Sequence, residues 1–204
     1  MNSYQEEQMA AFQLVREHLP ELKAMIQQTM AADLKAYVAF RQETDEFLDK
    51  YFADTCSASC YRSQLSACCT KDGIITFFAD WVVNIFFSDE PALDQMATRL
   101  QKTHSGTKCL YLSSEGCLWT IKPVVCQMFL CDRAQNEVFS CHPEAAARWN
   151  ALTEKKKAFT WPDKPVLFDT LESIFIAAGH RSPLMYLHNS PGLLRIKKQA
   201  GLKN

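Results

Sequence analysis

The stretch CLYLSSEGCLWTIKPVVCQMFLC, residues 109–131, decides how this chain folds. Its two short apolar runs, 109–112 and 117–119, flank the turn sequence Ser-Ser-Glu-Gly and therefore predict a small β-hairpin. A Lys-Pro pair then separates the hairpin from two more cysteines. Because the stretch lacks sustained helical periodicity, we expect an irregular, cysteine-rich centre here rather than a continuous helix.

A second group of cysteines precedes this stretch, between residues 56 and 69. Disulfides are one explanation, but the cysteine count of nine is odd and the first residues lack an export signal. Free cysteines can also pack as small apolar residues. Eight cysteines in two compact groups favour metal ligation through thiolates instead. The predicted metal ligands are Cys56, Cys60, Cys68, Cys69, Cys109, Cys117, Cys126 and Cys131.

The spacing of these cysteines leaves the identity and number of the metal centres open. Eight thiolates suit two four-cysteine zinc sites, two iron–sulfur clusters, or one site surrounded by buried thiols. Cys68 and Cys69 are adjacent, and neighbouring side chains of an extended segment point to opposite sides. Cys141 lies outside both groups and is expected not to bind metal. His142 follows it and is the histidine best placed to be an additional ligand.

Helices are predicted on both sides of the cysteine-rich part. Apolar residues recur at helical spacing before residue 53, where Pro20 marks the expected start of a second helix. The hydroxyl of Thr76 is expected to cap a buried helix within the centre. The chain is therefore predicted to be mainly α, a helical domain packed around a small irregular cysteine-rich metal-binding centre with a short β-hairpin. Its expected segments are N-terminal helices 1–53, cysteine-cluster core 54–142 and C-terminal helices 143–204, forming one compact domain.

Charge is distributed unevenly along a chain whose net charge is −1. Residues 1–54 carry 5 basic and 10 acidic side chains, whereas residues 141–204 carry 10 basic and 5 acidic ones. We expect these two ends to face each other rather than to bind nucleic acid, because no aromatic residues alternate with the basic ones for base stacking. No apolar run is long enough to span a membrane. These features predict a cytoplasmic protein.

Several residues of the centre occur in a familiar arrangement. Thr76 and Asp80 stand at an expected helix start, and Gly116-Cys117, Pro123 and Cys126 follow Cys109 in order, with Cys131 after them. In this order they resemble the bacterial CxxCxxCC (YkgJ-type) cysteine-cluster family, described as zinc- or iron-chelating. The first cysteine group departs from the family pattern, because three residues separate Cys56 from Cys60 and seven separate Cys60 from Cys68.

The resemblance implies a protein that holds zinc or an iron–sulfur cluster through Cys-thiolates. In the leading hypothesis, the metal is structural and the protein binds another protein as its partner. Two alternatives stay open: a metal-dependent protein-modifying enzyme, similar to a methyltransferase, and a metal chaperone. The chain contains neither a glycine-rich phosphate loop nor a nucleophile elbow. The sequence therefore points to no catalytic residue and leaves open whether the protein is an enzyme.

Overall fold

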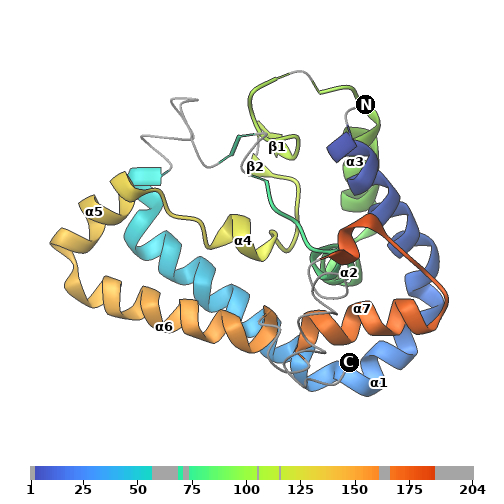
Figure 1. Ribbon diagram of the computed structural model, residues 1–204. Coiled ribbons are helices and arrows are strands. Elements are labelled where there is room, and N and C mark those ends of the chain that lie inside the picture. The colour runs from blue at the N-terminus through green and yellow to red at the C-terminus, as the bar shows by residue number, and fades with distance from the viewer. Residues whose placement is uncertain are drawn as a thin grey trace.

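The computed structural model describes residues 3–56, 69–70, 74–104, 106–114, 116–160 and 166–186. The described chain is mainly helical and contains a short antiparallel hairpin (Figure 1), which confirms this part of the prediction. Its elements are α1 (Ser3–Ala53), α2 (Phe78–Phe87), α3 (Glu90–Gln101), β1 (Leu112–Ser113), β2 (Gly116–Cys117), α4 (Val124–Gln127), α5 (Asp132–Cys141), α6 (Pro143–Thr160), α7 (Leu167–Ala177) and the 3-10 turn η3 (Pro183–Tyr186).

Helix α1 consists of two limbs that meet at an angle (Figure 1). The backbone leaves the helical region at Met30, where φ is −134° and ψ is 15°. The prediction that a new helix begins at Pro20 is wrong, because Pro20 lies inside the first limb. A proline removes one hydrogen bond from a helix interior. Leu19 and Leu22 on either side of it stay buried in the core, which keeps this part of the helix in place.

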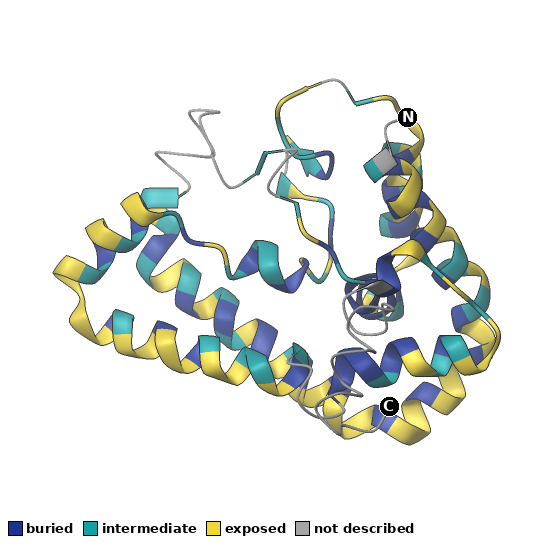
Figure 2. Cartoon of the chain, viewed as in Figure 1, coloured by how far each residue is buried: buried dark blue, intermediate teal, exposed yellow. Residues whose placement is uncertain are grey.

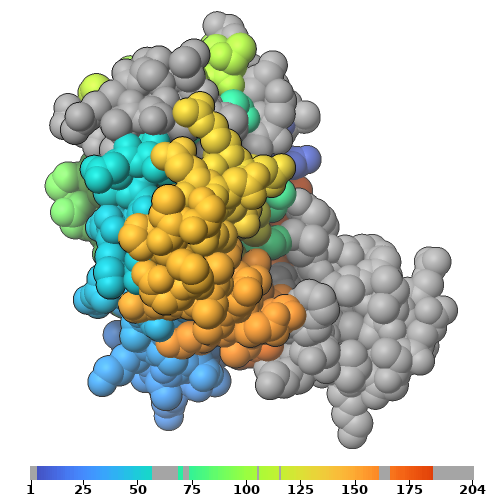
Figure 3. Space-filling view, turned by 90° about the vertical axis from the view of Figure 1, so that its left-hand side faces the viewer, coloured from blue at the N-terminus to red at the C-terminus, as the bar shows by residue number. Residues whose placement is uncertain are grey.

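The two limbs of α1 hold different parts of the molecule. On the first limb, Arg16 forms ion pairs of 2.7 Å with two acidic residues of α3. On the second limb, Phe47 stacks on Trp149 of α6, with ring centroids 5.5 Å apart. Helices α5 and α6 lie side by side against this limb (Figure 3). The bend at Met30 thus lets one helix support both ends of the molecule.

Helix α2 forms the centre of the core. Its sequence is apolar on nearly every side, and residues 78 to 85 are all buried (Figure 2). Trp81 packs edge-on against Phe12 of α1, with ring centroids 5.4 Å apart, and Phe78 packs in the same way against Phe175 of α7 at 5.1 Å. Helix α2 is packed on both sides, so the residues of its first turn form a rigid support for the chain segments that bind to them.

The oppositely charged ends of the chain meet at one described ion pair. Lys155 of α6 places its Nζ 2.6 Å from Oε2 of Glu43 on α1. Exposed pairs of this kind contribute little to stability. Residues 187–204, which hold much of the basic tail, lie outside the described residues, so electrostatic pairing of the ends stays a prediction. No helix of the described chain has the length and hydropathy needed to cross a membrane.

Candidate metal centre

The structure joins the two cysteine groups at one point of contact. Thr70 and Lys108 form an antiparallel bridge, and the N–H of Cys109 donates to the carbonyl oxygen of Cys69 at 2.8 Å. These hydrogen bonds set the two cysteines side by side although 40 positions separate them in the sequence. This contact therefore places one cysteine of the first group beside one cysteine of the second.

The hairpin and α4 bring two further thiols to this contact. Strand β2 carries Cys117, which pairs with Leu112 of β1, and α4 carries Cys126. Burial is the main cause that raises the pKa of the Cys109 thiol to about 12 and that of Cys126 to about 11, and nearby thiols contribute to both shifts. Burial also raises the pKa of Cys117, whose sulfur is surrounded by protein although the residue as a whole is exposed. The thiols that act on one another in this way are Cys69, Cys109, Cys117 and Cys126.

Backbone N–H groups donate to two of these sulfurs. The N–H of Tyr111 lies 3.4 Å from Sγ of Cys109, and the N–H of Trp119 makes the same kind of bond to Cys117 and lowers its pKa. Each donor stands two residues after its cysteine, within a Cys-Leu-aromatic sequence that occurs twice. Such hydrogen bonds favour the thiolate form that a metal requires. This role of Tyr111 and Trp119 was not predicted, although the repeated tripeptide is a signal for it in the sequence.

A buried carboxylate connects the first turn of α2 to the start of α4, the helix that carries Cys126. Asp80 is 3 % exposed and accepts hydrogen bonds from the N–H of Phe77 at 2.9 Å and from that of Val124 at 3.1 Å. The prediction that Thr76 caps this helix is wrong, because Asp80 accepts the free N–H and the Thr76 hydroxyl donates to Gln8 instead. Asp80 is therefore a structural tie between α2 and α4.

Two more buried polar residues bind the segment that leads into α4. Arg41 of α1 is 2 % exposed and donates from Nη2 to the carbonyl oxygen of Lys122. Asn84 of α2 accepts the N–H of Ile121 at 2.9 Å. Buried polar groups of this kind must be paired to be stable, so they fix the path of the chain. Helices α1 and α2 thereby determine where Cys126 lies.

We expect Asp80→Asn to lower the free energy of unfolding by about 2 kcal/mol, since an amide can accept only one of the two N–H groups and hydrogen bonds to charged groups contribute about 1.5–3 kcal/mol. Urea denaturation measures this change. Asp89→Asn is the matched control, because Asp89 is an exposed N-cap that accepts from Ala92 at 3.0 Å and asparagine caps equally well. Equal losses in the two variants would show that Asp80 is not a tie.

An aromatic cluster lies behind the thiols and converges on one glutamine. Oε1 of Gln8 accepts hydrogen bonds from Oγ1 of Thr76 at 2.8 Å, from Nε1 of Trp81 at 2.9 Å and from the hydroxyl of Tyr111 at 3.2 Å. Trp119 packs against Trp81, with ring centroids 4.1 Å apart. Gln8 thus attaches the first limb of α1 to the residues that follow Cys109.

The remaining predicted ligands lie elsewhere or are not described. Cys56 in the turn after α1 and Cys131 at the N-cap of α5 are both partly buried. Cys131 is not among the groups that shift the pKa of the four neighbouring thiols. Cys60 and Cys68 lie outside the described residues. Among the residues that are described, no three cysteine, histidine or acidic side chains converge closely enough to hold a metal ion.

The two residues outside the predicted groups are at the far end of α5. Cys141 is exposed in the last turn of this helix. His142 directs Nδ1 toward Oε1 of Glu144 at 3.3 Å, and its ring packs edge-on against Tyr51. These contacts account for His142 as a surface residue.

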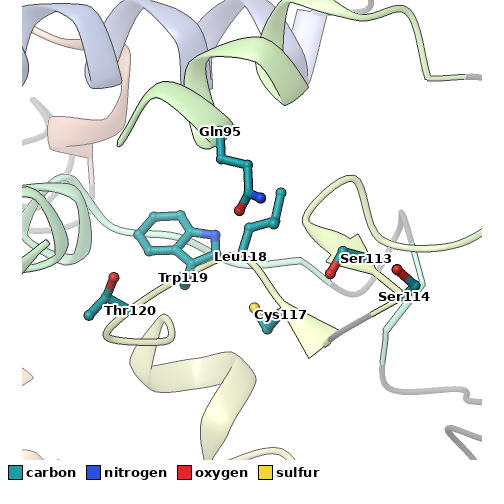
Figure 4. Close-up of a pocket in the computed structure, with 7 residues that line it drawn as sticks. All are labelled: Gln95, Ser113, Ser114, Cys117, Leu118, Trp119 and Thr120. Atoms are coloured by element: carbon teal, nitrogen blue, oxygen red, sulfur yellow. The ribbon is translucent and has the colours of Figure 1, made fainter. Parts of the chain in front are cut away.

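A pocket of about 330 Å³ opens beside Cys117 (Figure 4). It is lined by Gln95, Ser113, Ser114, Cys117, Leu118, Trp119 and Thr120. The side chain of Gln95 enters it from α3, and the other lining residues belong to the hairpin and the segment that follows it. No family model, curated protein or solved structure matches this chain. A function must therefore be argued from the side chains themselves.

Proposed function

We propose that this protein binds zinc or an iron–sulfur cluster through the thiolates of Cys69, Cys109, Cys117 and Cys126. The observation that supports this proposal is the backbone contact that sets Cys69 beside Cys109, with Cys117 and Cys126 near enough to affect the pKa of neighbouring thiols. Metal binding would have to draw the four sulfurs closer together than they lie in the described structure. Four thiolates form the usual ligand set of structural zinc sites and of iron–sulfur clusters. The donor set therefore suits either metal.

The surroundings of the thiols suit a bound cation. Protons occupy buried thiols at neutral pH because burial raises the pKa of Cys109 and Cys126. A metal cation stabilises thiolates in place of those protons, and this exchange makes metal binding contribute to folding. The N–H groups of Tyr111 and Trp119 then donate to sulfurs that carry negative charge. The tie at Asp80 keeps Cys126 in place before any metal arrives.

The other predicted ligands lie outside this set of four thiols. Cys56 follows α1 and Cys131 is the N-cap of α5, and a hydrogen bond of 3.1 Å from Oγ1 of Thr55 to Oε1 of Glu137 joins the end of α1 to the middle of α5. A second centre that includes these two thiols stays a prediction, as do the ligand roles of Cys60 and Cys68. A role in protein modification rests on the family resemblance alone. A role in metal transfer likewise stays an alternative that the sequence leaves open.

Metal analysis combined with the visible spectrum of protein purified without oxygen tests the proposal. Broad visible absorbance with acid-labile sulfide would identify an iron–sulfur cluster, and colourless protein with stoichiometric zinc would identify a zinc site. Either result supports a thiolate centre. A folded, metal-free protein in which all nine cysteines react with a thiol reagent would overturn it.

A further inference from the structure

Cys69 and Cys109 stand opposite each other across the bridge that joins the two cysteine groups. Thr70 and Lys108 pair in antiparallel register, so the residue before Thr70 lies opposite the residue after Lys108. The hydrogen bond of 2.8 Å from the N–H of Cys109 to the carbonyl oxygen of Cys69 fits this register. Opposite residues of an antiparallel pair project their side chains to the same face. The two thiols therefore lie on one side of the backbone contact.

The spacing of such a pair suits a disulfide bond. Opposite residues at a hydrogen-bonded position have Cα atoms about 5.5 Å apart. Disulfides join residues whose Cα atoms lie about 4.4–6.8 Å apart. Both cysteines are free thiols in the described structure, and each residue keeps part of its surface exposed to solvent. The bond can therefore form without a large movement of the backbone, at a position that solvent reaches.

The other two thiols of the proposed centre have different neighbours. Strand β2 sets Cys117 opposite Leu112 of β1. Sγ of Cys126 donates to the carbonyl oxygen of Ile75 at 3.7 Å. Among the cysteines that the structure describes, Cys69 and Cys109 are thus the pair that a backbone hydrogen bond holds in opposite positions. This arrangement favours a bond between these two sulfurs over other pairings.

We propose that Cys69 and Cys109 form a reversible disulfide with each other, and that the oxidant is a small disulfide such as oxidised glutathione. One protein thiolate attacks a sulfur of the small disulfide and expels one small thiol, which leaves a mixed disulfide. The second protein thiolate attacks the protein sulfur of that mixed disulfide and expels the second small thiol. The protein loses two electrons and two protons, and the small disulfide gains them as two thiols.

This inference goes beyond the proposed function and does not require a bound metal, because it rests on the backbone contact between the two cysteines. It nevertheless has a consequence for the proposed centre. The metal ligand is the thiolate, and a sulfur within a disulfide is no longer one. The disulfide would therefore remove two of the four proposed ligands, and its reduction would restore them.

Peptide mapping by mass spectrometry tests the disulfide in the full-length chain. The protein is incubated with mixtures of oxidised and reduced glutathione in the presence of a metal chelator. Free thiols are then blocked, and the chain is cleaved after lysine and glutamate. Glu115 lies between Cys109 and Cys117, so this cleavage separates the two cysteines. We expect the peptide that begins at Cys109 to be joined to the peptide that contains Cys69, and dithiothreitol to separate them.

The concentration of oxidant needed for the reaction measures how well folding prepares the pair. At a fixed concentration of reduced glutathione, half-conversion should need about a hundredfold less oxidised glutathione in native buffer than in urea. The two cysteines are 40 positions apart, and closing a loop of this length is unfavourable in the unfolded chain. Equal requirements in the two buffers, or a bond from Cys109 to another cysteine in native buffer, would overturn the proposal.

Cys68→Ser and Cys69→Ser are matched variants, because the two cysteines are adjacent and share one peptide. We expect Cys68→Ser to keep the disulfide and Cys69→Ser to abolish it. The opposite result would place the bond at Cys68 and overturn the assignment. Cys117→Ser removes a different thiol of the proposed centre and should also keep the disulfide, so the test does not depend on the folding of one variant.

Metal analysis of the reduced protein separates this inference from the proposed function. A folded, metal-free protein that forms the disulfide between Cys69 and Cys109 overturns the thiolate centre and supports the disulfide. A protein that binds metal but does not form this disulfide once the chelator has removed the metal overturns the disulfide and leaves the centre intact.

Discussion

Cys126→Ser is expected to remove the metal and to lower the melting temperature by about 10 °C or more. A thiolate ligand supplies both a bond to the metal and part of the folding free energy, because the unfolded chain has no assembled site. In a chain of this length, each kcal/mol of stability shifts the melting temperature by about 2–4 °C. Metal analysis and thermal unfolding of the same sample measure the two losses together.

Cys141→Ser is the matched control for this prediction. The substitution is the same, but Cys141 is exposed at the end of α5 and lies outside the four neighbouring thiols. Its metal content and melting temperature should equal those of the unchanged protein. Loss of metal from Cys141→Ser together with its retention in Cys126→Ser would show that the ligands are grouped incorrectly here.

Gln8→Leu is expected to lower the free energy of unfolding by about 3 kcal/mol or more. The substitution preserves most of the side-chain volume but removes the oxygen that accepts from Thr76, Trp81 and Tyr111. Each buried donor left without a partner costs about 1–3 kcal/mol, and the apolar leucine offsets only part of this loss. Chemical denaturation with urea gives the difference directly.

The same substitution at Gln42 separates this effect from helix propensity. Gln42 is also on α1, but it is exposed and its amide bonds only to Glu46, four residues away. We expect Gln42→Leu to change stability by less than about 0.5 kcal/mol, as is usual for surface substitutions. If Gln8→Leu were equally mild, the three donors would have other partners and Gln8 would not organise this part of the core.

Local patterns were enough to predict the fold class. The apolar stripes predict the helices on both sides of the centre, and Ser-Ser-Glu-Gly between two apolar runs predicts the hairpin that pairs Leu112 with Cys117. Helix α5 was not predicted, although Ala134 and Val138 lie four residues apart on its buried face. The apolar pattern of α5 is short and directly follows Cys131, so the sequence predicted an irregular segment there.

The arrangement of the centre depends on contacts that local patterns do not contain. Grouping cysteines by position along the chain separated Cys69 from Cys109, whereas a backbone hydrogen bond sets them side by side. Thr76 has the residue type of a helix cap, but the buried Gln8 provides a better acceptor for its hydroxyl. Pro20 is a common helix start, but burial of its neighbours outweighs the lost hydrogen bond. Tertiary contacts decide all three cases.

The two-limbed helix α1 has a consequence for the order in which the protein is made and folds. A ribosome synthesises α1 first, but α7 and η3 are among the elements that cover its apolar face. Leu184 and Met185 belong to the same buried cluster as Met9 and Phe12. During translation, the part of this face that α7 and η3 cover stays exposed until residues 167–186 have emerged, and exposed apolar surface of this kind is prone to aggregate. The nascent chain therefore exposes this apolar surface to chaperones until α7 and η3 have packed onto it.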